Sequence, residues 1–346
     1  MSNQKNRPEK NIERDAMPRR EFVRRLAATG VAIAGSAALG YKLWQPKHFV
    51  PGIGEKTSEL PQLRKFNIER GSTDVLLAAA HGDDVEKMVR AAIAELGGIE
   101  KFIKKGDRVI LKPNVAFDRP PKLGATTSPE VLAAVARLVK EAGASEIRIL
   151  DNPINQPEGC FTKSGIRQAI AELANELPVK LVLPSESQFQ TIRIDGPTLN
   201  NWPMFYKPFI DADKVIGIAP LKDHNLCHAS MTMKNWYGLL GGQRNQFHQD
   251  IFGVITDLGM MMTPTLVILD ATRILTRNGP TGGSMADVKP GHTVVAGVDH
   301  VAVDAFGAET LLKRDLDKIA YLKKAHDRGI GRMDWKQLNH REVTIS

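Results

Sequence analysis

SPEVLAAVARLVKEAGASEIRIL, residues 128–150, is the stretch that decides the predicted fold, because it joins a helix directly to a buried strand. Ser128 suits the N-cap of a helix, Pro129 suits the first helical position, and Gly143 suits the end of the helix. The apolar run EIRIL, residues 146–150, is then typical of a strand. A helix that leads straight into a strand is the building unit of α/β proteins.

The same alternation of helix and strand extends on both sides of this stretch. Further strands are expected at residues 74–80, 107–113, 179–184, 191–195, 214–220, 265–269 and 293–298. Helices are expected to begin near Asp83 and Thr162 and to cover residues 249–262, 300–314 and 317–326. Apolar strands of this length between helices indicate an α/β fold, in which a mostly parallel sheet is flanked by helices on both faces.

The composition sets the expected domain organisation. The 346 residues are 42% hydrophobic and 6% aromatic, which is enough to bury the core of one large domain or of two subdomains. The predicted segments are a leader at 1–40, a linker at 41–72, the α/β domain at 73–330 and a C-terminal extension at 331–346.

The charge of the chain argues against nucleic-acid binding. Half of the net charge of +8 lies in residues 1–40, which contain eight Lys or Arg and four Asp or Glu. The rest of the chain has no long basic stripe interleaved with aromatic residues, which is the pattern of a nucleic-acid-binding surface. We therefore expect no nucleic-acid partner.

The leader indicates export. Arg19 and Arg20 are followed by Phe22 and by a mild apolar run at residues 26–40, which is shorter than the roughly twenty strongly apolar residues of a membrane span. This pattern resembles a twin-arginine signal, although Pro18 stands where Ser or Thr is more usual. The resemblance implies transport by the twin-arginine translocase into the periplasm. The alternative is that the leader is not cleaved and anchors the protein. In that case the leader is the only segment predicted to contact a membrane.

The cysteine content limits the cofactors. Cys160 and Cys227 permit one disulfide in an oxidising compartment. Two cysteines are too few for an iron–sulfur cluster, which generally takes four ligands, so no such cluster is expected. The cofactor is otherwise unknown from the sequence.

Polar residues follow the predicted strands, where ligands bind in open α/β sheets. Asp and Asn after a strand are also common helix caps and turn formers, so a structural role for the aspartates remains open. The polar residues in question are Lys112, Asn114, Asp151, Lys222, His224, Asp270, Asn278, Gly279 and Asp299.

Three lysines suggest the charge of the ligand. Lys112, Lys222 and Lys234 would repel one another in a shared pocket unless an anion lies between them, which favours a small anionic ligand. Alternatively, one of these lysines is neutral and acts as a base or nucleophile. Asn114 and Asn235 add amides that can orient the ligand.

Histidines raise the possibility of a metal. His224 and His228 are four residues apart, Cys227 lies between them, and His248 lies downstream. A divalent metal bound by His224, His248 and Asp299 is one interpretation. Hydrogen bonding or proton transfer by His224 is the other.

The order and spacing of several motifs resemble those of the domain of unknown function 362 family of bacteria and archaea. The similarity extends over residues 74–312 and is carried by VILKPN, VIGIAPLKDH, MTMKNWYGLLGG, RNGPTGG and VVAGVDHVAVDAFGAE. The resemblance implies functional positions that include Lys112, Lys222, His224, Lys234, Asn235, His248, Asp270, Asn278, Asp299 and Asp304. Some relatives carry iron–sulfur modules, which implies redox chemistry, but the family name leaves the activity open.

The sequence therefore supports three hypotheses. The first is an exported enzyme that acts on a small anion, with or without redox or metal assistance, in which His224, Lys234 and Asp270 are catalytic. Its predicted substrate-binding residues are Lys112, Asn114, Lys222, Asn235, Asn278 and Gly279. The second is a non-catalytic periplasmic protein that binds an anion or metal, and the third is a surface-anchored interaction module.

Overall fold

The computed structural model describes residue 20 and residues 60–346. Arg19 and Phe22 of the predicted signal, and most of the predicted linker, lie outside the described residues. The described residues 60–346 belong to one compact unit. Within the described part of the chain, no helix is both long and apolar enough to cross a membrane.

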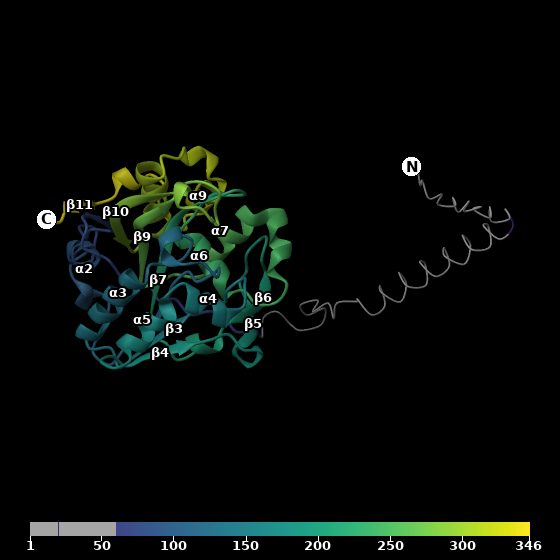
Figure 1. Ribbon diagram of the computed structural model, residues 1–346, viewed down its shortest axis with the longest axis horizontal. Coiled ribbons are helices and arrows are strands. Elements are labelled where there is room, and N and C mark those ends of the chain that lie inside the picture. Colours follow the sequence, from purple (N-terminus) through teal and green to yellow (C-terminus); the bar gives the residue numbers. More distant parts are fainter. Residues whose placement is uncertain (1–19, 21–59) are drawn as a thin grey trace, which may run out of the picture. The chain divides into compact units, whose positions relative to one another are not determined.

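A nine-stranded sheet forms the centre of this unit and confirms the predicted α/β class (Figure 1). Its strands follow the order β11-β1-β10-β9-β7-β2-β3-β4, and β8 pairs with the end of β7. The bounds are β1 Leu77–His81, β2 Arg108–Lys112, β3 Glu146–Leu150, β4 Val179–Val182, β7 Lys214–His224, β8 His228–Ser230, β9 Leu266–Leu275, β10 Val288–Gly297 and β11 His340–Thr344.

The sheet is mostly parallel, and its two inverted strands are β10 and the short β8, which is antiparallel to β7. Pairs from β9 through β7, β2 and β3 to β4 are parallel, as is β1 with β11. β10 is antiparallel to both of its neighbours, β9 and β1. The C-terminal end of β10 therefore lies at the sheet edge where β7 and β9 begin, opposite the edge where they end.

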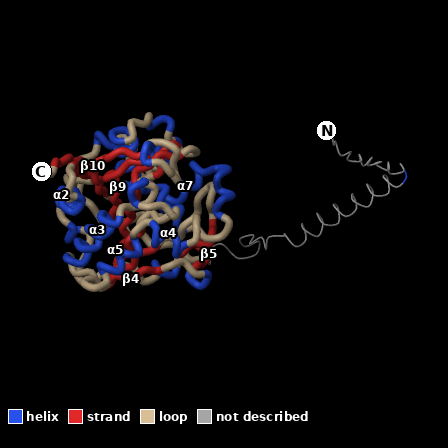
Figure 2. Tube along the Cα trace, in the orientation of Figure 1, coloured by secondary structure: helices blue, strands red, loops and turns tan. Residues whose placement is uncertain are grey.

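Helices cover both faces of the sheet, as Figure 2 shows. One core contains buried side chains of α2 to α5, and the other contains those of α6 to α9. Alternate strand residues point to opposite cores, so Leu77 and Ala79 lie in one and Ala78 and Ala80 in the other. The helices are α2 Val85–Glu95, α3 Pro129–Glu141, α4 Pro157–Lys163, α5 Ile166–Leu173, α6 Thr232–Asn235, α7 Ile251–Met261, α8 His300–Phe306 and α9 Ala320–Asp327.

Two segments differ from the sequence-based expectation. The strand expected at 191–195 does not join the main sheet but forms β5 (Phe189–Arg193), which pairs antiparallel with β6 (Asn201–Phe205) in a sheet of its own. The connection between them is too short for the crossover that a parallel pair needs. The predicted C-terminal extension supplies β11, which is an edge strand of the main sheet.

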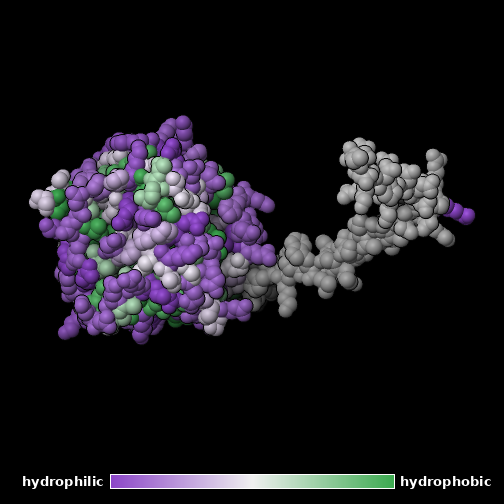
Figure 3. All heavy atoms as spheres, viewed as in Figure 1, coloured by the Kyte–Doolittle hydropathy of each residue, from purple (hydrophilic) through white to green (hydrophobic). Residues whose placement is uncertain are grey.

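Residues at the N-terminal end of the unit also pack into it, since the Phe66 side chain of the predicted linker is 3% exposed within the core. Cys160 and Cys227 are both buried and unpaired, so the considered disulfide is not formed. The face of the unit in Figure 3 is mainly hydrophilic. Ile154 and Leu226 are among the exposed large apolar side chains of the described residues, and both border the cavity described next.

Candidate functional site

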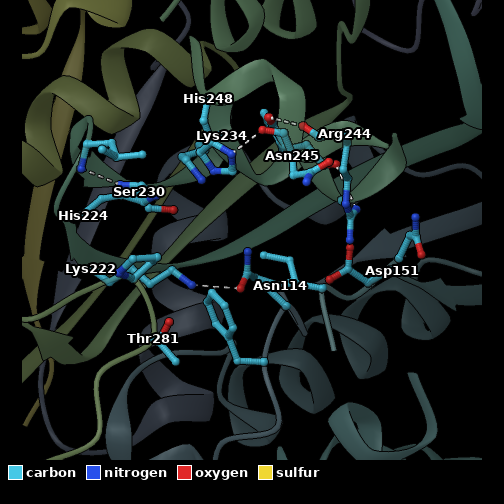
Figure 4. Close-up of a pocket in the computed structure, with 18 of the residues that line it drawn as sticks. Asn114, Asp151, Lys222, His224, Ser230, Lys234, Arg244, Asn245, His248 and Thr281 are labelled. Atoms are coloured by element: carbon cyan, nitrogen blue, oxygen red, sulfur yellow. Dashed lines mark hydrogen bonds between the residues drawn. The ribbon is translucent and has the colours of Figure 1, made fainter. Parts of the chain in front are cut away.

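A cavity of about 300 Å³ lies at the edge of the sheet where β2, β3 and β7 end. This is the edge at which ligands bind in open α/β sheets. Phe117, Ile154, Leu226 and Tyr237 supply apolar walls. The polar lining comprises Asn114, Asp151, Asn152, Lys222, His224, Asn225, Ser230, Lys234, Arg244, Asn245, His248 and Thr281 (Figure 4).

Lys112 and Asn235 lie beneath this cavity rather than on its wall. The Lys112 ammonium is fully buried and donates to three acceptors, which are Asp151 Oδ1 at 2.6 Å, Asn235 Oδ1 at 2.8 Å and the Pro113 carbonyl at 2.9 Å. Burial lowers the pKa of Lys112, and the Asp151 carboxylate opposes that effect. Asn235 also accepts from Asn114, which lines the cavity, so the lower layer positions the upper one.

Lys222 is also fully buried, but its surroundings differ. Its amine donates to Asn114 Oδ1 at 3.1 Å and to the Ala125 carbonyl at 2.6 Å, and both acceptors are neutral. Figure 4 shows the Lys222 side chain directed toward Asn114 within the cavity. Burial, followed by the positive charge of Lys234, lowers the pKa of Lys222 to about 7.

The cavity carries more positive than negative charge. Among the described residues, Lys222, Lys234 and Arg244 have no carboxylate within ion-pair distance, whereas Asp151 is paired with Lys112. The Lys234 ammonium lies 5.3 Å from the centre of the Tyr237 ring. Arg244 donates to the carbonyls of Tyr237, Leu240 and Pro153. Such a site is suited to an anion.

His224 is a neutral hydrogen-bond donor in this arrangement. Its Nδ1 accepts the Leu226 N–H at 3.1 Å, which places the ring proton on Nε2. Burial, and then the charges of Lys234 and Lys222, lower its pKa to about 2. The ring therefore stays neutral at physiological pH, and its low pKa makes it a poor proton acceptor there.

The sequence profile of the family described as "domain of unknown function (DUF362)" matches residues 109–309, which is more than half of the chain and includes every basic residue of the cavity. The chain belongs to the DUF362 family.

A thylakoid-associated protein of Synechocystis sp. is similar to this DUF362 chain, with 30% identity over 208 residues. The aligned part is 58% of this chain and 62% of that protein. Among solved structures, the lactate racemase apoprotein of Thermoanaerobacterium thermosaccharolyticum gives a TM-score of 0.37 at 14% identity, over 72% of this chain and 61% of that one. A protein of Thermotoga maritima gives a TM-score of 0.32 at 13% identity, over 75% of this chain and 60% of that one.

The three residues predicted as metal ligands do not come together. His224 and His248 both line the cavity, but Asp299 follows β10 and therefore lies at the opposite edge of the sheet. There Asp299 accepts from the backbone of Val301 and Ala302 as the N-cap of α8. Among the residues that the structure describes, no group of three or more His, Cys, Asp or Glu is arranged to hold a metal.

Asp270 also lies outside the cavity of this DUF362 protein. Its buried carboxylate accepts from the Ser128 N–H at 2.8 Å and from both the N–H and the hydroxyl of Thr272. Ser128 directly precedes α3, so Asp270 stabilises the start of that helix. The structure thus places this predicted catalytic residue in the structural role that the sequence left open.

Asn278 and Gly279 lie beside the cavity, next to Pro280 and Thr281, which line it. The Asn278 amide donates to Asp287, and the Gly279 N–H donates to Asp223 at 3.0 Å. A Cβ at Gly279 would lie 1.9 Å from the Asp223 carbonyl oxygen, so only glycine allows this approach. These two residues hold the loop that carries Thr281.

Sequence reasoning did not predict Arg244 as a site residue of this DUF362 protein, and it named Asp304 as a functional position without assigning it a role. Arg244 gave no signal in the sequence because it lies in a polar loop, where an arginine side chain is ordinarily solvated. Asp304 is fully buried and accepts from Thr232 and Met233 at the start of α6, the helix that carries Lys234. The signal for Asp304 was a charged residue on the otherwise apolar helix HVAVDAF.

Proposed function

We propose that this DUF362 protein is an enzyme that binds a small organic anion in the cavity at the ends of β2, β3 and β7. The observation that carries the proposal is the set of three basic side chains, Lys222, Lys234 and Arg244, around a cavity of about 300 Å³ with no carboxylate paired to them among the described residues. That volume is at the lower end of the range for small-molecule sites.

Some of the residues of the cavity bind the anion, and others take part in the reaction. Lys234 and Arg244 lie on the cavity wall and hold the anion, and Asn114 orients it. His224 donates a hydrogen bond from Nε2, and Lys222 is the group that takes or gives a proton near neutral pH. A titratable group of this kind, with a pKa near the working pH, is what an enzyme needs and a simple binding protein does not.

Lys234→Ala is expected to weaken binding of a small anion by about 10- to 100-fold, because a hydrogen bond to a charged group contributes about 1.5–3 kcal/mol. Acetate, succinate and inorganic phosphate are titrated calorimetrically into the wild type and the variant. Lys324→Ala, which removes an exposed lysine of α9, is the matched control and should bind like the wild type. The proposal fails if no probe binds, or if both variants lose the same affinity.

The enzymatic part is tested separately from binding. The anion that binds best is incubated with the protein and followed by NMR and mass spectrometry. Chemical conversion that Lys222→Met abolishes supports an enzyme. A bound anion that is never converted, with the wild type or the variant, supports the non-catalytic binding protein instead.

We further propose that the protein is exported by the twin-arginine translocase, on the pattern of Arg19, Arg20 and Phe22. Replacement of both arginines by lysine is expected to leave the full-length protein in the cytoplasm, because that replacement keeps the charge and removes the paired guanidinium groups. Fractionation of cells measures the result, and washing of the membranes distinguishes a released protein from an anchored one. Equal export of the wild type and the double variant would refute the proposal.

A further inference from the structure

We propose that the Lys222 amine forms an imine with the carbonyl group of the bound anion, which makes the substrate an oxo acid. The inference rests on the proposed function and adds to it the class of substrate and the covalent role of one residue. Lys222 is the candidate because it lines the cavity and its Nζ hydrogen-bonds only to neutral acceptors.

The acceptors around the two buried lysines Lys112 and Lys222 differ in number and in charge. Lys112 has three acceptors, one of them a carboxylate, which match the three N–H groups of an ammonium. Lys222 has two, Asn114 Oδ1 and the Ala125 carbonyl, which match the two N–H groups of a neutral amine. In its neutral form the Lys222 amine can keep both of these hydrogen bonds while its lone pair attacks a carbonyl carbon.

The electrostatics of the cavity agree with this geometry. A pKa of about 7 leaves about half of the Lys222 amines neutral at neutral pH, against fewer than about one in a thousand at the ordinary lysine value of 10.5. Lys234 is the cation that lowers the pKa most after burial itself. A second cation next to an amine is a known means of activating a lysine nucleophile.

The remaining groups fit an oxo acid. Lys234 and Arg244 are positioned for its carboxylate, and the Phe117 ring, whose centre is 5.2 Å from Lys222 Nζ, shields the amine. The Nε2–H of His224 can donate to the carbonyl oxygen. In the reaction the nitrogen forms a bond to the carbonyl carbon, the carbon–oxygen bond breaks, and both amine protons leave with the oxygen as water. A proton from solvent then gives the iminium, and no oxidant or reductant is required.

The test is reductive trapping of the full protein with pyruvate or glyoxylate and sodium borohydride. Hydride reduces the imine to a stable secondary amine, which is located by peptide mass spectrometry. We expect an adduct on Lys222 in the wild type and its loss in Lys222→Arg and Lys222→Met. Lys112 is an internal control and should stay unmodified, because its ammonium is fully paired. The iminium acidifies the methyl protons of bound pyruvate, so that solvent can remove and replace them, and the wild type should therefore exchange these protons in D₂O whereas the two variants should not.

Calorimetry with the same oxo acids separates this inference from the proposed function. If the wild type binds pyruvate or glyoxylate but gives neither adduct nor proton exchange, the imine is refuted and the anion site stands. If adducts appear on surface lysines to the same extent in the wild type and Lys222→Met, the assignment to Lys222 is refuted. If neither oxo acid binds while acetate or phosphate does, the substrate class is wrong. If no anion binds, the proposed function itself fails.

Discussion

Asp151→Ala is expected to destabilise the folded protein by about 3–5 kcal/mol, because it leaves the ammonium of Lys112 buried without its carboxylate. The Lys112 side chain is 0% exposed and that of Asp151 is 2% exposed, and their charged atoms are 2.6 Å apart. The variant also removes the acceptor of the Val115 N–H, which donates to Asp151 at 2.7 Å. Urea-induced unfolding, followed by circular dichroism at pH 7, measures the loss.

Two further variants test whether this loss of stability comes from the buried ion pair. Asp327→Ala breaks an exposed ion pair with Lys323 and should cost less than about 1 kcal/mol, because surface ion pairs contribute little. The double replacement Lys112→Met and Asp151→Leu removes both charges and should recover much of the stability lost in Asp151→Ala. Equal losses in Asp151→Ala and Asp327→Ala would show that the buried pair does not stabilise the fold.

The buried pair also explains a glycine beside the cavity. A Cβ at Gly238 would lie 2.1 Å from Asp151 Oδ1 and 2.8 Å from Lys112 Nζ. The backbone at Gly238 therefore packs directly on the ion pair, and Gly238 itself lines the cavity. Gly238, within the segment at residues 231–242, is thus required by close packing on the lower layer of the site.

Much of the fold could be predicted because its signals are local. Helix α3 shows its start in Ser128 and Pro129, and the strands show as short apolar runs. The positions of Lys222 and Asn114 at strand ends follow from the parallel arrangement of β2 and β7. That part of the candidate site was therefore accessible from sequence alone.

Strand direction and long-range contacts were not accessible in this way. β10 has the same apolar pattern as a parallel strand, and only its pairing with β9 and β1 shows that it is inverted and that Asp299 lies at the other edge. The role of Lys222 depends on hydrogen-bond acceptors such as Ala125, which is 97 residues away from Lys222 along the chain. Residue type and spacing carry no information about such contacts.

Asp304→Ala is expected to cost about 2–5 kcal/mol of folding free energy, because two buried backbone N–H groups lose their acceptor. The Asp304 carboxylate accepts from Thr232 N at 2.8 Å, from the Thr232 hydroxyl at 2.6 Å and from Met233 N at 2.9 Å. These bonds fix the start of α6, which carries Lys234, so binding of the probe anions should also weaken. Asp315→Ala removes an exposed cap of the Asp317 N–H and is the matched control, with a loss below about 1 kcal/mol.

Asp304→Asn separates the hydrogen bonds from the charge. It keeps an acceptor for Thr232 and gives up the bond from Met233, so an intermediate loss of about 1–2 kcal/mol is expected at pH 5.

Burial raises the pKa of Asp304 to about 7, so between about pH 4 and 7 the folded wild type retains a proton that the unfolded chain has released. The contribution of this group to stability therefore falls as the pH rises through that window. The Asp304→Asn variant has no such proton. The difference between its free energy of unfolding and that of the wild type should therefore become smaller from pH 5 to pH 8 in urea unfolding experiments. If this difference stays constant from pH 5 to pH 8, Asp304 does not titrate over that range, and it accepts the hydrogen bonds of α6 in a single charge state.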